Sequence, residues 1–391
     1  MVRAMESKGD IRIGIIGVGS MGANHARTIL DGKVPGLAVA AVADREPGAR
    51  AAFPGVEAYE DGSALIRDAA VDAVLIATPH YSHTTLGIEA LEKGLHVLVE
   101  KPISVHKEDC EKLIAAYSGD PKQVFAAMFN QRTDPRYRKA RELIRSGELG
   151  TVRRLNWVIT DWFRTEAYYQ SGGWRATWGG EGGGVLLNQC PHQLDLWQWL
   201  FGMPSRVTAR CQIGRFHDVE VEDSVTALLE YESGVQGVFV TTTGEAPGVN
   251  RLEIVGDRGR LEIGGGDDLR YERNEVPADR FLRESEGRFA KPGAWEVRIP
   301  AAGKGAQHVG ILENFAGAIR GAEELLAPAV EGVHSVELAN AMLLSEFTGA
   351  PVDLPMDGAV YAAQLKKKIE SSTFVKKTRE VEDKGDFNQS F

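Results

Sequence analysis

Short apolar runs alternate with helix-like stretches through the first third of the chain. The apolar runs lie at 11–16, 37–44, 71–78, 95–102 and 123–129, and the stretches that predict helices lie at 21–30, 62–70, 84–93 and 106–118. Continuous apolar runs of this length are typical of parallel strands that are buried on both faces. Because crossovers between parallel strands are right-handed, this alternation predicts a doubly wound, mostly parallel sheet.

The pattern changes after about residue 150. Longer segments, several of which alternate apolar and polar residues, occupy 151–163, 206–216, 223–233, 235–244, 250–264 and 269–276. Such alternation is typical of an antiparallel sheet with one covered face. Two later stretches, 308–321 and 333–347, predict helices. We therefore expect a second, α+β domain with a large open, mainly antiparallel sheet.

Charge and cysteine content narrow the class of protein. The 391 residues carry a net charge of −10, which argues against a basic face for nucleic acid. Three distant cysteines without a CxxC pair argue against a disulfide framework or a zinc ribbon. No apolar run approaches the roughly 18 residues of a membrane span, and the start of the chain shows no signal peptide. We expect a cytoplasmic protein with neither nucleic-acid nor membrane partners.

Glycine makes up 44 of the 391 residues and is concentrated in two clusters. The first is the GxGxxG of Gly17, Gly19 and Gly22, which includes Ser20 and Met21 and lies between a buried strand and a helix. The first glycine makes the tight turn, the second lets the backbone approach a pyrophosphate, and the third lets the helix pack closely. In this context the pattern predicts a Rossmann domain that binds a dinucleotide at the helix N-terminus, with a ligand-free glycine turn as the alternative.

Residues at the ends of the next strands extend this cofactor site. Asp44 ends the second strand, where a carboxylate accepts hydrogen bonds from the ribose hydroxyls and repels a 2′-phosphate. This favours NAD over NADP, although Arg45 could hold a phosphate or stack on adenine. Thr78 and Pro79 close a further strand at the edge where ligands bind in such sheets. His83 either caps the next helix or contacts the cofactor.

A charged pair, Glu100 and Lys101, stands at the mouth of another buried strand, before Pro102. The functional interpretation is that Lys101 donates a hydrogen bond to a reacting hydroxyl or carbonyl. A surface lysine beside Glu100 is the alternative. We expect Pro102 to fix the backbone here, and a cis bond is one way to do so.

The second glycine cluster places seven glycines within 172–184, and six of the seven tryptophans lie between 157 and 199. On a helix predicted from about residue 185, Asn188, His192 and Asp195 recur at i, i+4 and i+7 and share one face. An internal histidine satisfied by asparagine is the alternative. No metal is expected, because His192 has no second ligand at clear spacing other than Asp195.

These residues resemble the Gfo/Idh/MocA family, that of glucose–fructose oxidoreductase and inositol dehydrogenase. The matching pieces, in family order over about residues 11–202, are IGVGSMG, AVAD, ATPHYSH, VEKPIS, FNQR, GWR and GGGVLLNQCPHQLDLWQWLFG. The resemblance implies a Rossmann domain at 10–130 and a substrate-binding α+β domain at 131–371 that packs in homodimers or homotetramers. For the polar residues 372–391 we expect a loose tail or an arm that grips a neighbouring subunit.

The resemblance also implies roles for single residues. Lys101 and His192 would be catalytic and bind the reacting hydroxyl, and one of them would accept its proton. Asn130, within FNQR, would join the cofactor-binding residues. Inositol dehydrogenases have an aspartate four residues before the histidine, whereas this chain has Asn188. An asparagine can orient the ring or bind substrate but cannot relay a proton.

The sequence predicts only the chemical class of the substrate. Tyr168 and Trp174 could stack on the C–H face of a sugar, although each could equally be a core residue. Arg132, Arg164 and Arg175 could bind hydroxyls or an anionic group such as a carboxylate, phosphate or sulfonate.

The leading hypothesis is NAD-dependent oxidation of a secondary hydroxyl of a sugar, glycoside or cyclitol. The main alternative is an NAD-dependent glycoside hydrolase that transiently oxidises C3, eliminates the aglycone, adds water and reduces the ketone. The third hypothesis is a non-catalytic protein that senses NAD(H).

Overall fold

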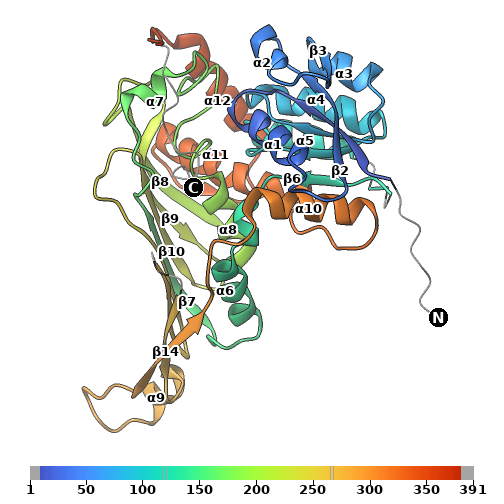
Figure 1. Cartoon of the computed structure of the whole chain (residues 1–391). Helices are drawn as coiled ribbons and strands as arrows, with labels where there is room; N and C mark the ends of the chain where they lie inside the picture. The colour runs from blue at the N-terminus through green and yellow to red at the C-terminus, as the bar shows by residue number, and fades with distance from the viewer. Residues whose placement is uncertain (1–8, 118, 121, 265, 267, 380–391) are drawn as a thin grey trace, which may run out of the picture. The chain divides into compact units, whose positions relative to one another are not determined.

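The computed structural model describes residues 9–379 apart from 118, 121, 265 and 267. The chain forms two compact units (Figure 1). The first contains the chain up to Ser104, Asp109–Asn130 and Ala306–Val333, and the second contains the remainder. The expected division at residue 130 assigned Ala306–Val333 to the second domain, whereas this segment lies in the first unit.

A six-stranded parallel sheet forms the centre of the first unit. Its strand order is β3-β2-β1-β4-β5-β6, so the order reverses between β1 and β4. The strands are β1 (Ile11–Ile16), β2 (Leu37–Ala43), β3 (Glu57–Tyr59), β4 (Ala73–Ile76), β5 (His96–Val99) and β6 (Phe125–Ala127). The helices are α1 (Ser20–Leu30), α2 (Pro47–Ala51), α3 (Gly62–Asp68), α4 (Tyr81–Glu92), α5 (Lys107–Ala116) and α10 (Gln307–Ile319), with a short 3₁₀ turn at Ala329–Glu331. A second 3₁₀ turn, Asn130–Thr133, lies where the chain passes from the first unit to the second. The predicted doubly wound fold is confirmed.

The segment Ala306–Val333, which contains α10, packs against this sheet although it lies far from the strands in the sequence. The amide of Ala127 in β6 donates to the carbonyl of Ala327 at 3.0 Å. The guanidinium of Arg320 donates to the carbonyl of Gly36 at 3.1 Å. Figure 1 shows this segment in orange beside the blue strands. Because these contacts join residues far apart in the sequence, no local pattern could predict them.

A nine-stranded sheet dominates the second unit, in the order β14-β13-β12-β11-β7-β10-β9-β8-β15. All its pairings are antiparallel except β7 with β10, so the predicted mainly antiparallel sheet is confirmed. The strands are β7 (Val152–Ile159), β8 (Arg206–Ile213), β9 (Glu222–Glu230), β10 (Gln236–Thr242), β11 (Asn250–Gly256), β12 (Gly259–Ile263), β13 (Asp268–Asn274), β14 (Ala294–Pro300) and β15 (Val352–Asp353).

The helices of this unit are α6 (Pro135–Arg145), α7 (Glu166–Gln170), α8 (Pro191–Phe201), α9 (Ala278–Glu284), α11 (Gly332–Thr348) and α12 (Gly358–Ser371). Trp197 fixes α8 on the sheet, because its ring occupies the space that a side chain at Gly237 of β10 would need. A Cβ built on Gly237 would lie 2.5 Å from Cζ2 of Trp197. The Trp197 ring also stacks on Trp157 of β7 at 6.5 Å. Within the described residues, no helix is long and apolar enough to cross a membrane.

Candidate active site

The first glycine cluster brings α1 against the end of β1. Gly17 has φ of +84°, and a Cβ there would lie 2.8 Å from the carbonyl oxygen of Ala77 after β4. A Cβ on Gly22 would lie 1.8 Å from the carbonyl oxygen of Gly17, a distance that no side chain tolerates. Gly19 differs, because nothing lies within 4 Å of where its Cβ would be. Two glycines therefore permit packing, and the third leaves open space.

This open space fits a dinucleotide pyrophosphate. Gly19 is the N-cap of α1, no side chain caps the helix, and its first turn contains no acidic residue. Free first-turn amides and the helix dipole favour an anion at that point. Beside them, the buried hydroxyl of Thr78 has no hydrogen-bond partner among the described residues. Ser20 and Met21 begin the helix, as expected of cofactor-binding positions.

Asp44 ties the glycine loop to the end of β2. Its carboxylate accepts from the amide of Val18 at 2.8 Å and from the amide of Glu46 at 3.0 Å. The guanidinium of Arg50 in α2 donates to the carbonyls of Asp44 and Arg45. Arg45 itself is exposed. The sequence analysis missed Arg50, whose spacing from Asp44 gave no distinctive signal.

His83 joins two loops of the first unit. Its Nε2 lies 2.8 Å from the carbonyl oxygen of Thr78, and its Nδ1 lies 2.8 Å from that of Pro102. Because α4 begins at Tyr81 with His80 as N-cap, the helix-cap alternative for His83 is wrong. Burial lowers the pKa of His83, so the neutral ring donates to one carbonyl at a time. Pro79 is exposed on the first of these loops.

The loop that contains Pro102 is held in place by the buried carboxylate of Glu100. Glu100 accepts from Nε2 of His25 in α1 at 2.7 Å, and from the backbone amide of Lys101 at 3.1 Å. Burial alone would raise the pKa of Glu100, but the hydrogen bond and charge of His25 lower it to about 2. The bond between Lys101 and Pro102 is cis, as suggested. Glu100 thus positions the backbone of Lys101, whose side chain is partly exposed.

The start of α10 adds residues that the sequence analysis missed. The side chain of Gln307 accepts from Nδ2 of the buried Asn130 at 2.7 Å. The ring of His308 lies 5.4 Å from that of His25. Burial, and then the charge of His25, lower the pKa of His308 to about 4. Asn130 is therefore engaged within the first unit by a helix that follows it by more than 170 residues.

In the second unit, α8 begins later than predicted. It starts at Pro191, so Asn188 lies in the preceding turns and does not share a helical face with His192. Proline fits the first helical position, because it has no amide to donate. His192 is the second helical residue and is 2% exposed.

The second glycine cluster brings these turns against β9. A Cβ on Gly184 would lie 1.9 Å from the carbonyl oxygen of Glu222. The Glu222 side chain accepts from the amides of Gly184 and Leu186 at 2.8 and 3.0 Å. Burial raises the pKa of this carboxyl group to about 7. The glycines therefore fix the approach of the chain to α8, as the first cluster does for α1.

A buried ion pair anchors α8. Arg132 donates through Nε and Nη2 to the two carboxylate oxygens of Asp195, at 2.8 and 2.6 Å, and both side chains are at most 1% exposed. Gln198 donates to the same carboxylate at 3.1 Å. We expected Arg132 to bind substrate, but its guanidinium is buried and bonded to Asp195. The geometry instead favours Arg132 as a positioning residue for the helix that carries His192.

Four expected substrate-binding residues gather around Tyr168. Its hydroxyl donates to Oδ1 of Asn188 at 3.0 Å and accepts from Nη1 of Arg175 at 2.8 Å. The Arg175 guanidinium lies over the rings of Tyr168 and Trp174 at 4.6 and 4.8 Å. Asn188 donates through Nδ2 to Glu181. The amide of Asn188 is thus oriented from both sides.

A histidine that the sequence analysis missed holds Arg164 in this group. His217 places Nδ1 3.0 Å from Asp223 and Nε2 2.9 Å from the carbonyl oxygen of Arg164. Burial lowers the pKa of His217, but the hydrogen bonds to Asp223 and to the Arg164 carbonyl outweigh it, and the net shift is upward. The doubly protonated ring satisfies both acceptors. The Arg164 guanidinium lies 5.1 Å from the ring of Tyr168.

Replacing single glycines separates packing from cofactor binding. Gly22→Ala should destabilise the fold by about 1–3 kcal/mol, because its methyl group overlaps the Gly17 carbonyl. Gly19→Ala should leave the melting temperature unchanged but weaken NAD binding at least about tenfold, because its methyl enters the open space at the helix N-terminus. Thermal unfolding and NAD titration measure the two effects. Unchanged NAD affinity in Gly19→Ala would contradict the placement of the pyrophosphate.

The raised pKa of His217 predicts a dependence of stability on pH. A histidine whose folded pKa is raised stabilises the protein fully below its unfolded value of about 6.5, and this contribution is lost as pH rises through the folded pKa. The free energy of unfolding should therefore fall above about pH 6.5, and the fall should be smaller in His217→Gln. Chemical denaturation across this range measures both. An identical pH slope in the variant would refute the assignment.

Two family models match the chain. The model described as an oxidoreductase family with an NAD-binding Rossmann fold matches residues 11–128. The model described as the GFO/IDH/MocA C-terminal domain matches residues 137–262. The two matches follow one another along the chain and correspond to the two expected domains.

Curated relatives and solved structures extend over nearly the whole chain. Inositol 2-dehydrogenase 2 of Saccharopolyspora erythraea is 29% identical over 90% of this chain and 98% of its own length. Inositol 2-dehydrogenase of Rubrobacter xylanophilus is 27% identical over 87% and 92%. The WlbA dehydrogenase of Chromobacterium violaceum, solved with NADH and UDP-GlcNAcA, has a TM-score of 0.77 at 26% identity, covering 90% of this chain and 98% of that one.

These three relatives are dehydrogenases, and they give no support to the glycosidase alternative. The NAD-binding model coincides with the unit that contains the open glycine loop and Asp44. The chain belongs to the Gfo/Idh/MocA family of oxidoreductases, and its first unit contains an NAD-binding Rossmann domain.

Proposed function

We propose that this protein oxidises a secondary hydroxyl of a sugar, glycoside or cyclitol and passes the hydride to NAD. The observation that carries the proposal is the open, uncapped start of α1 beside Asp44, in a chain whose inositol dehydrogenase relative aligns over 90% of it. The polar and aromatic group around Tyr168 supports a substrate with several hydroxyls, because it offers amide, phenol and guanidinium groups together.

Bound NAD supplies the hydride acceptor. Lys101 and His192 bind the reacting hydroxyl, and one of them accepts the proton at Lys101 Nζ or at a ring nitrogen of His192 as the C–H bond breaks. The secondary alcohol becomes a ketone: its hydroxyl proton goes to Lys101 or His192, and its carbon-bound hydrogen goes to NAD as a hydride. Glu100 fixes the backbone of Lys101, and the Arg132–Asp195 pair fixes the helix of His192.

Asn188 orients a group rather than relaying a proton. Its carbonyl oxygen accepts from Tyr168, and its amide nitrogen donates to Glu181. A side-chain amide neither takes up nor releases a proton near neutral pH, so the proposal assigns the base to Lys101 or His192. Asn188 and Tyr168 then contribute to substrate position.

Asp44 determines the choice of cofactor. Its carboxylate is partly exposed at the end of β2, where a 2′-phosphate would meet a like charge. NAD is therefore preferred over NADP. The exposed Arg45 is the adjacent group that could reduce this preference.

A substrate panel tests the proposed function. Purified protein with NAD is given free sugars, cyclitols and aryl glycosides, and both NADH and released aglycone are followed. The expected result is one NADH per molecule of ketone formed, for at least one compound. Aglycone release without NADH accumulation would contradict the proposal and restore the glycosidase. NAD binding without turnover of any compound would favour a sensor.

The variant Lys101→Met tests the role of Lys101 in the same assay. Loss of a positioned acid–base group should reduce NADH formation by about 100-fold or more. NAD affinity should persist, because the glycine loop is untouched. Turnover close to that of the unaltered protein would remove Lys101 from the mechanism.

A further inference from the structure

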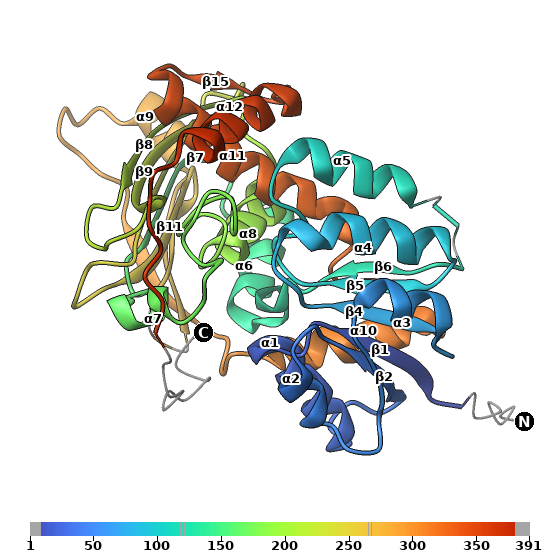
Figure 2. The ribbon, with the colours of Figure 1, turned by 90° about the horizontal axis from the view of Figure 1, so that it is seen from above.

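The last described residues form an arm on the second unit. Residues 372–379 follow α12, and Figure 2 shows them in dark red running from α12 toward α7. Ser372 donates to Glu220, Lys377 pairs with Asp218 at 2.6 Å, and the amide of Arg379 donates to the carbonyl of Gln170 at 3.1 Å. The arm therefore has defined contacts at both of its ends.

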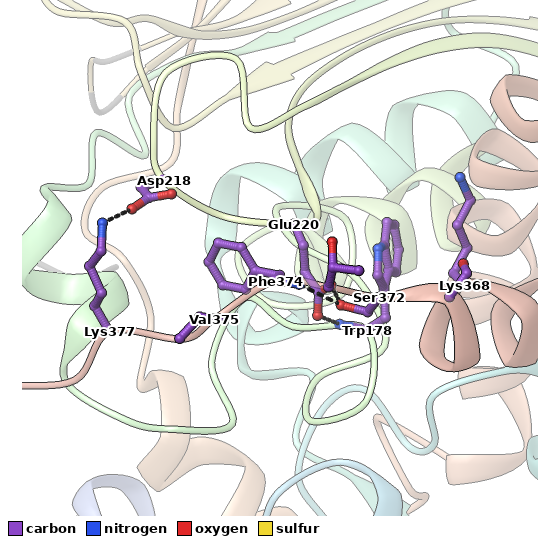
Figure 3. Close-up of a pocket in the computed structure, with 10 residues that line it drawn as sticks. Trp178, Asp218, Glu220, Lys368, Ser372, Phe374, Val375 and Lys377 are labelled. Carbon is purple, nitrogen blue, oxygen red and sulfur yellow. Dashed lines mark hydrogen bonds and ion pairs between the residues drawn. The ribbon is translucent and has the colours of Figure 1, made fainter.

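One edge of the arm borders an open cavity of about 590 Å³ (Figure 3). Lys377, Val375 and Asp218 line this cavity, together with Trp178 and Glu220. Among its charged groups, Lys377 pairs with Asp218, Glu220 accepts from the amide of Trp178 at 2.9 Å, and Lys368 lies over the ring of Phe347.

The end of the arm passes close to the loop that carries Arg175. Residues 373, 375 and 377 are exposed, whereas Phe374 and Lys376 are partly buried, as expected for an extended segment with one covered face. Thr378, which shares the face of Lys376, places its methyl carbon 3.9 Å from where a Cβ on Gly173 would lie. The alternation puts Lys376 on the same face of the arm as Thr378, whereas Lys377 lies on the opposite face and pairs with Asp218.

Two further cations on this side lack carboxylate partners. Arg164 and Arg175 form no ion pair with any residue that the structure describes, and the buried Nε of each has no hydrogen-bond partner there. Their side-chain hydrogen bonds go to the carbonyl of Phe163 and to the hydroxyl of Tyr168. Both guanidiniums lie over the Tyr168 ring. Like charges gathered around one ring are unfavourable unless an anion joins them.

Of the neighbouring carboxylates, Glu181 is engaged through both of its oxygens, whereas Glu166 keeps one buried oxygen without a hydrogen-bond partner among the described residues. Glu181 accepts from Asn188 and from the amide of Ala176, and Glu166 accepts from the amide of Asp218. Burial lowers the pKa of Lys376, and the positive charge of Arg175 adds to this shift, whereas the negative charges of Glu181, Glu166 and Asp218 oppose it. Lys376 therefore belongs to the same electrostatic environment as Arg175.

We propose that Arg164, Arg175 and Lys376 form an anion-binding site, and that the arm thereby selects a sugar or cyclitol carrying a carboxylate or phosphate. The proposal rests on the proposed function for the reaction but assigns its own substrate class. The two guanidiniums supply planar donors that match an oxyanion, and the lysine supplies a point charge. The Tyr168 hydroxyl and the Asn188 amide lie beside these cations, so the charged group and the hydroxyls of one substrate are recognised together.

Calorimetric titration of the full chain with three probes tests this site. The probes are glucuronate, glucose 6-phosphate and glucose. At least one anionic sugar should bind about tenfold or more tightly than glucose, as expected for one charge-assisted contact. Whichever of glucuronate and glucose 6-phosphate binds more tightly identifies the anionic group of the substrate as a carboxylate or a phosphate. Equal affinity for all three, or no binding of either anion at millimolar concentration, would overturn the proposal.

Two adjacent lysines provide the matched variants. Lys376→Met should lose about tenfold in affinity for the preferred anion with little change for glucose, and Lys376→Arg should restore most of it. Lys377→Met removes the same charge one residue away and should retain the preference. Equal losses in both methionine variants would show a general charge effect and refute the site. If Lys376→Met fails to fold, Lys376→Gln and Arg175→Met replace it.

The outcomes also separate this inference from the proposed function. NADH formation from neutral sugars without any preference for anions would refute the anion site and leave the dehydrogenase standing. An anion preference that depends on Lys376, with no NADH from any compound, would refute the dehydrogenase and leave the anion site standing.

Discussion

Contact between backbones that only glycine permits is the constraint on which both units depend. A Cβ on Gly22 would lie 1.8 Å from the Gly17 carbonyl, and a Cβ on Gly184 would lie 1.9 Å from that of Glu222. In each case a helix follows a loop that is held directly against a strand. The first contact leaves the amides of α1 facing open space, and the second fixes the approach to α8. The surplus of glycine therefore has a structural use at two specific places.

Buried charges then position the side chains proposed for chemistry. His25 holds Glu100 beside Lys101, Arg132 holds Asp195 three residues after His192, and Asp223 with His217 holds the backbone of Arg164. Removing one partner from such a buried pair typically costs about 3–5 kcal/mol, because the other charge remains buried without compensation. These pairs are weak evidence for stability as such. Their consistent position next to proposed site residues indicates that they set geometry.

The sequence predicted what local patterns encode. Five apolar runs predicted five of the six strands of the parallel sheet, the GxGxxG predicted the open loop, and Asp44 was found at the end of its strand. It missed the short β3, which has only three residues and lacks an apolar run, with Glu57 and Ala58 exposed. It also began α8 too early: the i, i+4, i+7 spacing of Asn188, His192 and Asp195 suggested one helix, but Pro191 begins the helix and leaves Asn188 in a turn.

Long-range contacts account for the other differences. Gln307 and His308 join the first unit from α10, and Arg132 is buried by a partner 63 residues later. The local sequence pattern around Gln307, His308 or Arg132 cannot predict a partner that lies so far away in the chain. The same holds for the arm, whose residues form a polar tail by composition and whose contacts, such as that of Lys377 with Asp218, are made with distant residues.

Isotope transfer tests the central claim of hydride transfer to NAD most directly. A compound that produces NADH is supplied with deuterium at the carbon bearing the oxidised hydroxyl, and the NADH is analysed by mass spectrometry and proton NMR. The account predicts one deuterium at C4 of the nicotinamide ring for each ketone formed. Deuterium that is released to water, or retained in the product, would contradict it.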